Sequence, residues 1–202
     1  MIFSMTKAAK FALVAGPLAM GGYGVARNIG RLDNVYGPGF DWQLAHFLGL
    51  AGFLLFVPLV LGLRTLLPAG TVREVVVGAT LLGLATSVVQ FGVDIVQAFL
   101  AADKEELRSL QHDFSGLPGV RPAIYDVGPL FFFVGIVVVA VLAARAGRLP
   151  WWSPVVMLVG VLLPPVNLDL MPLAGLLMLV ALLPLRRSFR QVSAAERAEP
   201  LA

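Results

Sequence analysis

Apolar residues fill long stretches of the chain, and polar residues gather in the segments between them. Several stretches approach the roughly 20 residues that a helix needs to cross a hydrocarbon core about 30 Å thick. We therefore predict an all-α fold, a polytopic membrane bundle of about six membrane-spanning helices. Their approximate ranges are 8–26, 43–66, 74–101, 124–144, 151–166 and 170–185.

Two local patterns refine this layout. The last two helices come from one apolar stretch that is too long for a single crossing, and PPVNLD at 164–169 interrupts it. Because prolines cannot donate backbone hydrogen bonds and polar residues cluster there, we expect a tight hairpin. The loop 102–123 carries Leu107, Leu110 and Phe114 at near-helical spacing beneath a charged face, which predicts a short interfacial helix.

Composition agrees with a membrane protein. Of 202 residues, 58% are hydrophobic and 13% charged, whereas soluble domains have about 45–50% apolar and about 25% charged residues. We expect one membrane domain over residues 1–187 and a basic, mostly disordered cytoplasmic tail over 188–202. The absence of cysteine excludes disulfides, thiolate metal sites and thiol nucleophiles.

The distribution of basic residues predicts the orientation. If the N-terminus is cytoplasmic, ten of the 15 Lys and Arg residues fall on the cytoplasmic side and five on the outer side. Cytoplasmic segments carry the excess of positive charge, so we expect both termini in the cytoplasm and the protein in the plasma membrane. The basic residues stand singly or in pairs beside apolar stretches, which does not indicate a nucleic-acid partner.

The third predicted helix carries an unusual polar stripe. Its segment SVVQFGVDIVQAF places Ser87, Gln90, Asp94 and Gln97 on one side. An acid at a helix centre costs about 2.5–3.5 kcal/mol on insertion scales, whereas each large apolar residue contributes about 0.3–0.6 kcal/mol in favour of insertion. The helix therefore inserts, and its polar stripe must face protein or water.

Other polar residues fall at a similar depth. Asp94 follows the inner end of its helix by about twenty residues, or about 30 Å, which brings it near the outer boundary. In the same topology, polar residues open the second and fourth helices and occupy the hairpin. This set forms an expected outer polar layer: His46, Gln90, Asp94, Gln97, Asp126, Asn167 and Asp169.

The outer polar layer suggests acid–base chemistry. A partly desolvated carboxyl group favours its neutral form, so Asp94 would act as a general acid, and a second acid or His46 would take the proton back. This suits isomerisation, cyclisation or hydration of a lipophilic small molecule, without a cofactor. The predicted catalytic residues are Asp94, His46, Asp126 and Asp169, and the predicted substrate-binding residues are Gln90, Gln97, Asn167, Trp42, Tyr36 and Phe91.

Each member also has a structural alternative. Asp126, Asn167 and Asp169 are compatible with helix caps at the headgroup level. His46 follows Trp42 by four residues and is compatible with an interfacial anchor. Asp94 is compatible with a buried hydrogen bond between helices. We assign His112, beside Asp113 in the loop, to the solvated surface.

The same residues are compatible with other functions, and some classes of site can be excluded. Two histidines cannot form a three-His zinc site, and we assign no metal. The HExxH, P-loop, dinucleotide-binding and GxSxG motifs are also absent. A proton-coupled transporter would use Asp94 as its proton site, but we find no inverted repeat, and Thr80 and Thr86 are compatible with bonds to their own helix. A noncatalytic membrane assembly subunit is a third alternative. Expected partners are membrane lipids and the lipophilic molecule, and a homo-oligomer is compatible with the sequence.

Overall fold

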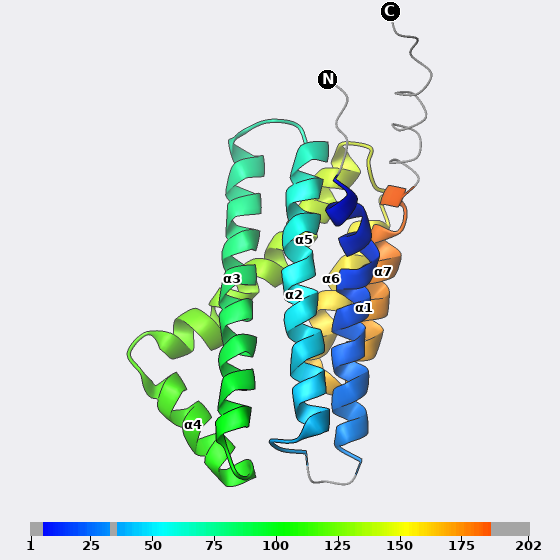
Figure 1. Ribbon diagram of the computed structural model, residues 1–202. Coiled ribbons are helices and arrows are strands. Elements are labelled where there is room, and N and C mark those ends of the chain that lie inside the picture. Colours follow the sequence, from blue (N-terminus) through cyan, green and yellow to red (C-terminus); the bar gives the residue numbers. More distant parts are fainter. Residues whose placement is uncertain (1–5, 33–35, 187–202) are drawn as a thin grey trace, which may run out of the picture.

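The computed structural model describes residues 6–32 and 36–186, and over these ranges the chain forms helices and connections without strands (Figure 1). The α-helices are α1 (Lys7–Gly30), α2 (Phe40–Leu66), α3 (Thr71–Leu100), α4 (Lys104–Gly116), α5 (Gly128–Arg145), α6 (Ser153–Val166) and α7 (Met171–Leu182). A π-helix, η1 (Arg121–Asp126), precedes α5, and a 3₁₀ turn, η2 (Leu168–Leu170), joins α6 to α7. The all-α prediction is confirmed. The predicted tail at 188–202 lies outside the described residues.

All the α-helices except α4 pack in two layers of three. α3, α2 and α1 lie side by side in one layer, and α5, α6 and α7 form the second layer behind them (Figure 1). The layers meet where α3 packs on α5 and where α1 packs on α7. Lys7 lies at one end of the bundle with the end of α7. We name the opposite end, which carries α4, η2 and the α1–α2 connection, the distal end.

Local sequence explains where several helices begin and end. The Thr6 hydroxyl accepts a hydrogen bond from the Ala9 amide at 3.2 Å and caps the start of α1. α5 ends at Arg145, and Gly147 follows it with a φ of 70°, in the left-handed region that glycine adopts without strain. The amide of Arg148 then bonds back to the carbonyl of Ala143, which satisfies a free carbonyl of the last turn.

Aromatic and aliphatic side chains fill the space between the layers. Phe132 of α5 inserts toward α2, where its ring meets Phe53 and Phe56 at centroid distances of 5.6 and 5.0 Å. Both contacts are edge-to-face, the arrangement that aromatic quadrupoles favour. Met157 of α6 and Met178 of α7 are fully buried on the other side of this core.

Glycines allow the two layers to approach closely. A methyl group at Gly83 of α3 would overlap the backbone of Phe132 on α5. A methyl group at Gly175 of α7 would lie 2.5 Å from the backbone nitrogen of Gly21 on α1. Such close approach of backbones through small residues is a common way for apolar helices to pack in membranes.

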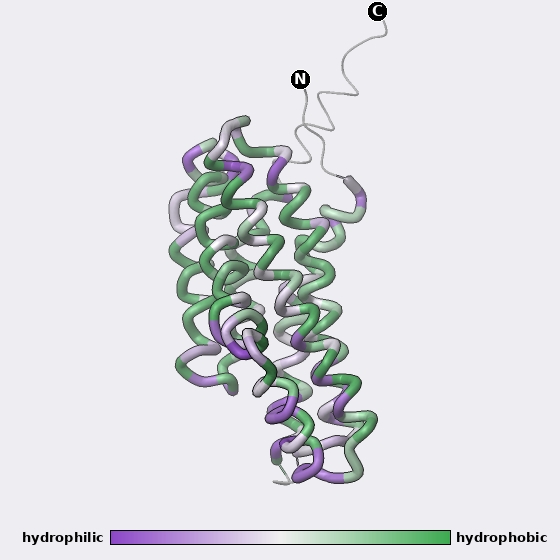
Figure 2. The backbone as a smooth tube through the Cα atoms, turned by 90° about the vertical axis from the view of Figure 1, so that its left-hand side faces the viewer, coloured by the Kyte–Doolittle hydropathy of each residue, from purple (hydrophilic) through white to green (hydrophobic). Residues whose placement is uncertain are grey.

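The hydropathy of the bundle supports membrane association. Three helical segments are long and apolar enough to cross a membrane: Phe40–Leu66, Thr71–Leu100 and Arg121–Arg145. Figure 2 shows hydrophobic residues along the length of the bundle, with hydrophilic residues gathered toward its ends. Large apolar side chains such as Leu18, Leu82 and Val134 point outward and are exposed. α6 and α7 are apolar but contain 14 and 12 residues, fewer than a span of about 20.

Candidate functional site

Asp94 lies on the side of α3 that faces α4 and η1. Its side chain is buried, with 6% of its surface exposed. The side-chain amide of Gln111 on α4 donates a hydrogen bond to its carboxylate, with 3.4 Å between Nε2 and Oδ1. Ser87 and Gln97 on the same stripe are also buried, and Gln90 is half-buried. The polar stripe therefore faces protein, as its composition requires.

A pocket of about 370 Å³ opens beside Asp94 at the distal end. α4 leaves α3 at the distal tip and diverges from it, and the chain then returns to α3 through η1 (Figure 1). We name this space the Asp94 pocket. Its lining residues are Asp94, Gln111, His112, Ser115, Arg121, Tyr125 and Asp126.

The π-helix η1 supplies the wall opposite Asp94. The ring of Tyr125 packs edge-on against Phe114 of α4, with 6.3 Å between centroids. The hydroxyl of Tyr125 is buried and lies close enough to Asp94 to interact with its carboxyl group. Arg121 and Asp126 form an exposed ion pair at 3.7 Å on the rim. π-Helical turns are rare, and they occur frequently at functional sites.

Besides Gln111 and Phe114, a cap, a polar contact and an apolar contact hold α4 in place. The carboxylate of Asp103 accepts hydrogen bonds from the amides of Glu105 and Glu106 and caps the helix. The side chain of Gln97 donates to the carbonyl of Leu110 at 2.9 Å. Leu107 is buried against Trp42 and Ala98. The predicted short helix is confirmed, and its apolar side packs against α2 and α3.

His46 belongs to an aromatic cluster rather than to the lining of the Asp94 pocket. Its ring stacks on Trp42 at a centroid distance of 3.3 Å and also contacts Tyr23 and Phe91. His46 Nδ1 lies 2.8 Å from the carbonyl oxygen of Trp42. Because a carbonyl oxygen only accepts, Nδ1 is protonated and donates this hydrogen bond. Phe91, one turn before Asp94 on α3, links the cluster to the helix that carries the acid.

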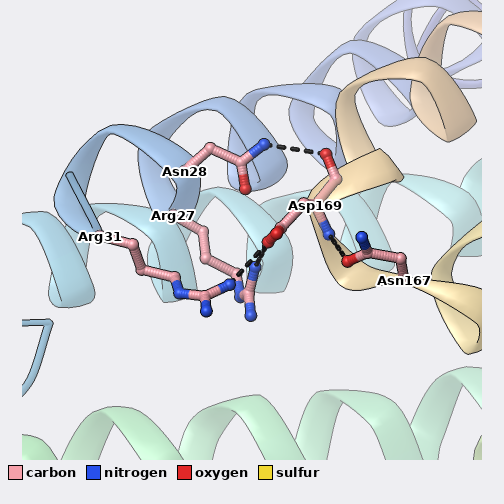
Figure 3. A network of polar contacts seen from close by, with 5 residues as sticks. All are labelled: Arg27, Asn28, Arg31, Asn167 and Asp169. Atoms are coloured by element: carbon pink, nitrogen blue, oxygen red, sulfur yellow. Dashed lines mark hydrogen bonds and ion pairs between the residues drawn. The ribbon is translucent and has the colours of Figure 1, made fainter. Parts of the chain in front are cut away.

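Asp169 joins a separate network on the α1 side of the bundle (Figure 3). Its carboxylate accepts hydrogen bonds from Arg27 at 2.6 Å and from Arg31 at 2.7 Å, and Asn28 donates to its backbone carbonyl at 2.9 Å. The bond from Arg27 is the main cause that lowers the pKa of Asp169, with further contributions from Arg31. Asn167 caps η2 by accepting a hydrogen bond from the Asp169 amide. This network ties the α6–α7 hairpin to α1.

The outer polar layer is thus present at the distal end but divides into separate groups. Asp94 and Asp126 line one pocket, His46 and Trp42 lie in the aromatic cluster, and Asp169 is paired with arginines. Tyr36 lines a second pocket, described below. Sequence reasoning did not select several of the residues that line the Asp94 pocket: Gln111, His112, Ser115, Arg121 and Tyr125.

A signal for one of these residues was present in the sequence. Position 111 flanks Leu107, Leu110 and Phe114 on the apolar side of α4. If that side packs on another helix, the side chain of Gln111 points toward that helix. The exposed His112 lines the pocket from the surface of α4.

The Asp94 pocket offers proton-transfer groups and hydrogen-bond donors. A carboxyl group, a phenol and an amide converge on it, with a second carboxyl group and an imidazole among its lining residues. Among residues 6–32 and 36–186, no group of three His, Asp or Glu side chains is arranged to hold a metal ion. No protein-family model matches the chain, and comparisons with curated proteins and solved structures find no match.

Proposed function

We propose that the protein is a plasma-membrane enzyme with six membrane-spanning helices and cytoplasmic termini, and that its Asp94 pocket opens on the outer side. In this proposal the enzyme catalyses isomerisation, cyclisation or hydration of a lipophilic small molecule without a cofactor. The observation that carries the proposal is a buried acid, Asp94, at the wall of an open pocket that also contains the buried hydroxyl of Tyr125.

The proposed chemistry is a pair of proton transfers. With its carboxyl group protonated, Asp94 donates a proton to one carbon of a substrate double bond. Asp126 takes a proton from the allylic carbon next to the other end of that double bond, so the double bond shifts by one position and the substrate keeps its proton count. The Tyr125 hydroxyl and the Gln111 amide orient polar groups of the substrate. Proton exchange with water through the open pocket then returns both carboxyl groups to their starting protonation states.

The deeper polar groups of α3 favour an enzyme over a carrier. The hydroxyls of Thr80, Thr86 and Ser87 donate to carbonyls of their own helix, at 2.7, 2.9 and 2.9 Å respectively. These bonds occupy the side chains that would otherwise line a path from Asp94 toward the other end of the bundle.

The test compares lipid-soluble metabolites of cells that express the native protein, Asp94→Asn or Asp113→Asn at equal levels. Asp113 is an exposed acid on α4 that does not line the pocket, so its substitution is the matched control. We expect a product that depends on the native protein, persists with Asp113→Asn and disappears with Asp94→Asn. Equal product from the native protein and Asp94→Asn would refute the role of Asp94. Proton-coupled uptake into vesicles that Asp94→Asn abolishes, with unchanged metabolites, would identify a carrier instead.

A further inference from the structure

A second pocket, of about 510 Å³, lies on the other side of the distal end. It is formed by the end of α1, the residues Leu32 and Tyr36 between α1 and α2, the first residue of α4 and the α6–α7 hairpin. We name it the α1–α4 pocket. Its lining residues are Asn28, Arg31, Leu32, Tyr36, Lys104 and Asp169. The Asp94 pocket shares none of these residues.

Among the described residues that line the α1–α4 pocket, two cations, Arg31 and Lys104, face one carboxylate, Asp169. The single carboxylate of Asp169 is shared by Arg27 and Arg31, so this cluster retains one positive charge. Arg31 uses one terminal nitrogen for Asp169, and its half-exposed guanidinium keeps further N–H donors. Lys104 is exposed and has no ion-pair partner within residues 6–32 and 36–186.

Two acids close to Lys104 in the sequence are engaged elsewhere, and the carboxylate of Glu105 forms no ion pair with Lys104 among the described residues. The carboxylate of Asp103 accepts from two amides at the start of α4, and Glu106 accepts from the amide of Ala102 at 2.7 Å. The ammonium group of Lys104 is therefore available to a ligand in the pocket.

Two buried polar atoms of the lining residues lack hydrogen-bond partners among the described residues. They are the hydroxyl oxygen of Tyr36 and the side-chain oxygen of Asn28. Burial raises the pKa of Tyr36, so its phenol stays protonated and can donate a hydrogen bond. Leaving such groups unpaired lowers stability, and a ligand that pairs with them would recover that loss.

We propose that the α1–α4 pocket binds a phosphate group, with Arg31, Lys104 and Tyr36 donating to its oxygens and Asn28 accepting from a neighbouring hydroxyl or amine of the ligand. Guanidinium and ammonium groups are the usual partners of phosphate in proteins. The pocket is larger than a phosphate ion, and the exposed side chain of Leu32, just after α1, is one of its lining residues. Ile29, in the last turn of α1, is also exposed. A phospholipid headgroup supplies the phosphate, the hydroxyl or amine, and the acyl chains that these side chains would contact. This site is independent of the proposed enzyme activity.

The test uses the purified full chain in uncharged detergent micelles and measures its thermal unfolding midpoint with added ligands. One arm adds inorganic phosphate or glycerol 3-phosphate, and the other adds phosphatidylglycerol. Diacylglycerol, which has the acyl chains but no phosphate, is the lipid control. The variants are Lys104→Gln and Tyr36→Phe, and Arg108→Gln is the matched control. Arg108 lies one turn further along α4, does not line the pocket, and its loss removes the same charge.

We expect phosphatidylglycerol to raise the unfolding midpoint and diacylglycerol to leave it unchanged. Lys104→Gln and Tyr36→Phe should each weaken the apparent affinity about tenfold, while Arg108→Gln stays within about twofold of the native protein. The same pattern with soluble phosphate alone would support the site and identify a free phosphate compound as its ligand. No stabilisation by any phosphate compound, or equal stabilisation of the native protein and Lys104→Gln, would overturn the proposal.

Discussion

Gln111 on α4 donates its side-chain amide to the carboxylate of Asp94 on α3, with 3.4 Å between nitrogen and oxygen. The contact joins a long apolar helix to a short polar one. α4 is polar because its outer surface is exposed and charged, and Leu107 is the residue that it buries. It is also the hydrogen bond that the described structure gives to the Asp94 carboxylate.

Removing the donor should destabilise the contact between α3 and α4. We expect Gln111→Met to lower the free energy of unfolding by about 1 kcal/mol, since a buried acceptor loses its partner. The loss should be smaller in an Asp94→Asn background, where the acceptor is neutral. Unfolding of the two single variants and the double variant in micelles measures this coupling. An identical loss in both backgrounds would show that Gln111 acts only through packing.

The network around Asp169 should stabilise the attachment of the α6–α7 hairpin to α1. Asp169→Asn removes the charge that Arg27 and Arg31 share, and we expect a lower unfolding midpoint at neutral pH. Asp113→Asn, an exposed acid of α4, is the control for a change in net charge and should have little effect. The prediction fails if both variants unfold at the same temperature.

The same ion pairs predict a pH dependence with a definite sign. The pKa of Asp169 is lowered below its ordinary value of 3.8 in the folded protein, chiefly by the hydrogen bond from Arg27. Its stabilising contribution is therefore complete above that ordinary value and disappears as the pH falls through the lowered pKa. As the pH falls below 3.8 toward the lowered pKa, the unfolding midpoint of the native protein should fall more steeply than that of Asp169→Asn. Parallel curves would exclude this contribution.

The close contact between α3 and α5 should not tolerate a larger residue. Gly83→Ala places a methyl group against the backbone of Phe132, and we expect a loss of about 1–3 kcal/mol, typical of overpacking. Gly78→Ala is the matched control on the same helix, because a methyl group there meets no atom within 4 Å. Gly78→Ala should be neutral or slightly stabilising. Circular dichroism melts of the two variants test the difference, and equal melts would contradict the described packing.

The proposed orientation can be tested with single cysteines because the native chain has none. Asp113→Cys on α4 should react with a membrane-impermeant maleimide on intact cells. Ala69→Cys, in the exposed connection between α2 and α3, should react only after permeabilisation. The reverse pattern would invert the topology, and labelling of both sites on intact cells would argue against a spanning bundle.

The helices were predictable from the sequence because long apolar stretches have few alternatives. The prediction 43–66 corresponds to Phe40–Leu66, and 74–101 corresponds to Thr71–Leu100. The start of the fourth predicted helix, at 124, was less accurate. There the chain forms the π-helix Arg121–Asp126 before α5 begins at Gly128. No local sequence rule distinguishes such a wide turn from the first turn of an α-helix.

The candidate site was predictable only in part because sequence gives depth but not direction around the bundle. Asp94 was placed correctly on a polar stripe that faces protein. Asp169 lies at the same end of the molecule, yet its arginine partners are 142 and 138 residues away in the chain. Arg27 and Arg31 were interpreted as topology signals, and their pairing with Asp169 depends on how the hairpin packs on α1.

Two pairs of helices in the bundle differ in length, and in the proposed six-helix topology this difference would affect the surrounding lipid. α2 and α3 contain 27 and 30 residues, while α6 and α7 contain 14 and 12. At about 1.5 Å per residue, the first pair extends about 40–45 Å and the second about 18–21 Å. Acyl chains shorten or tilt next to a segment that is shorter than the hydrocarbon core. The bilayer would thus be thinner beside α6 and α7, and lipids with short acyl chains would gather on that side of the protein.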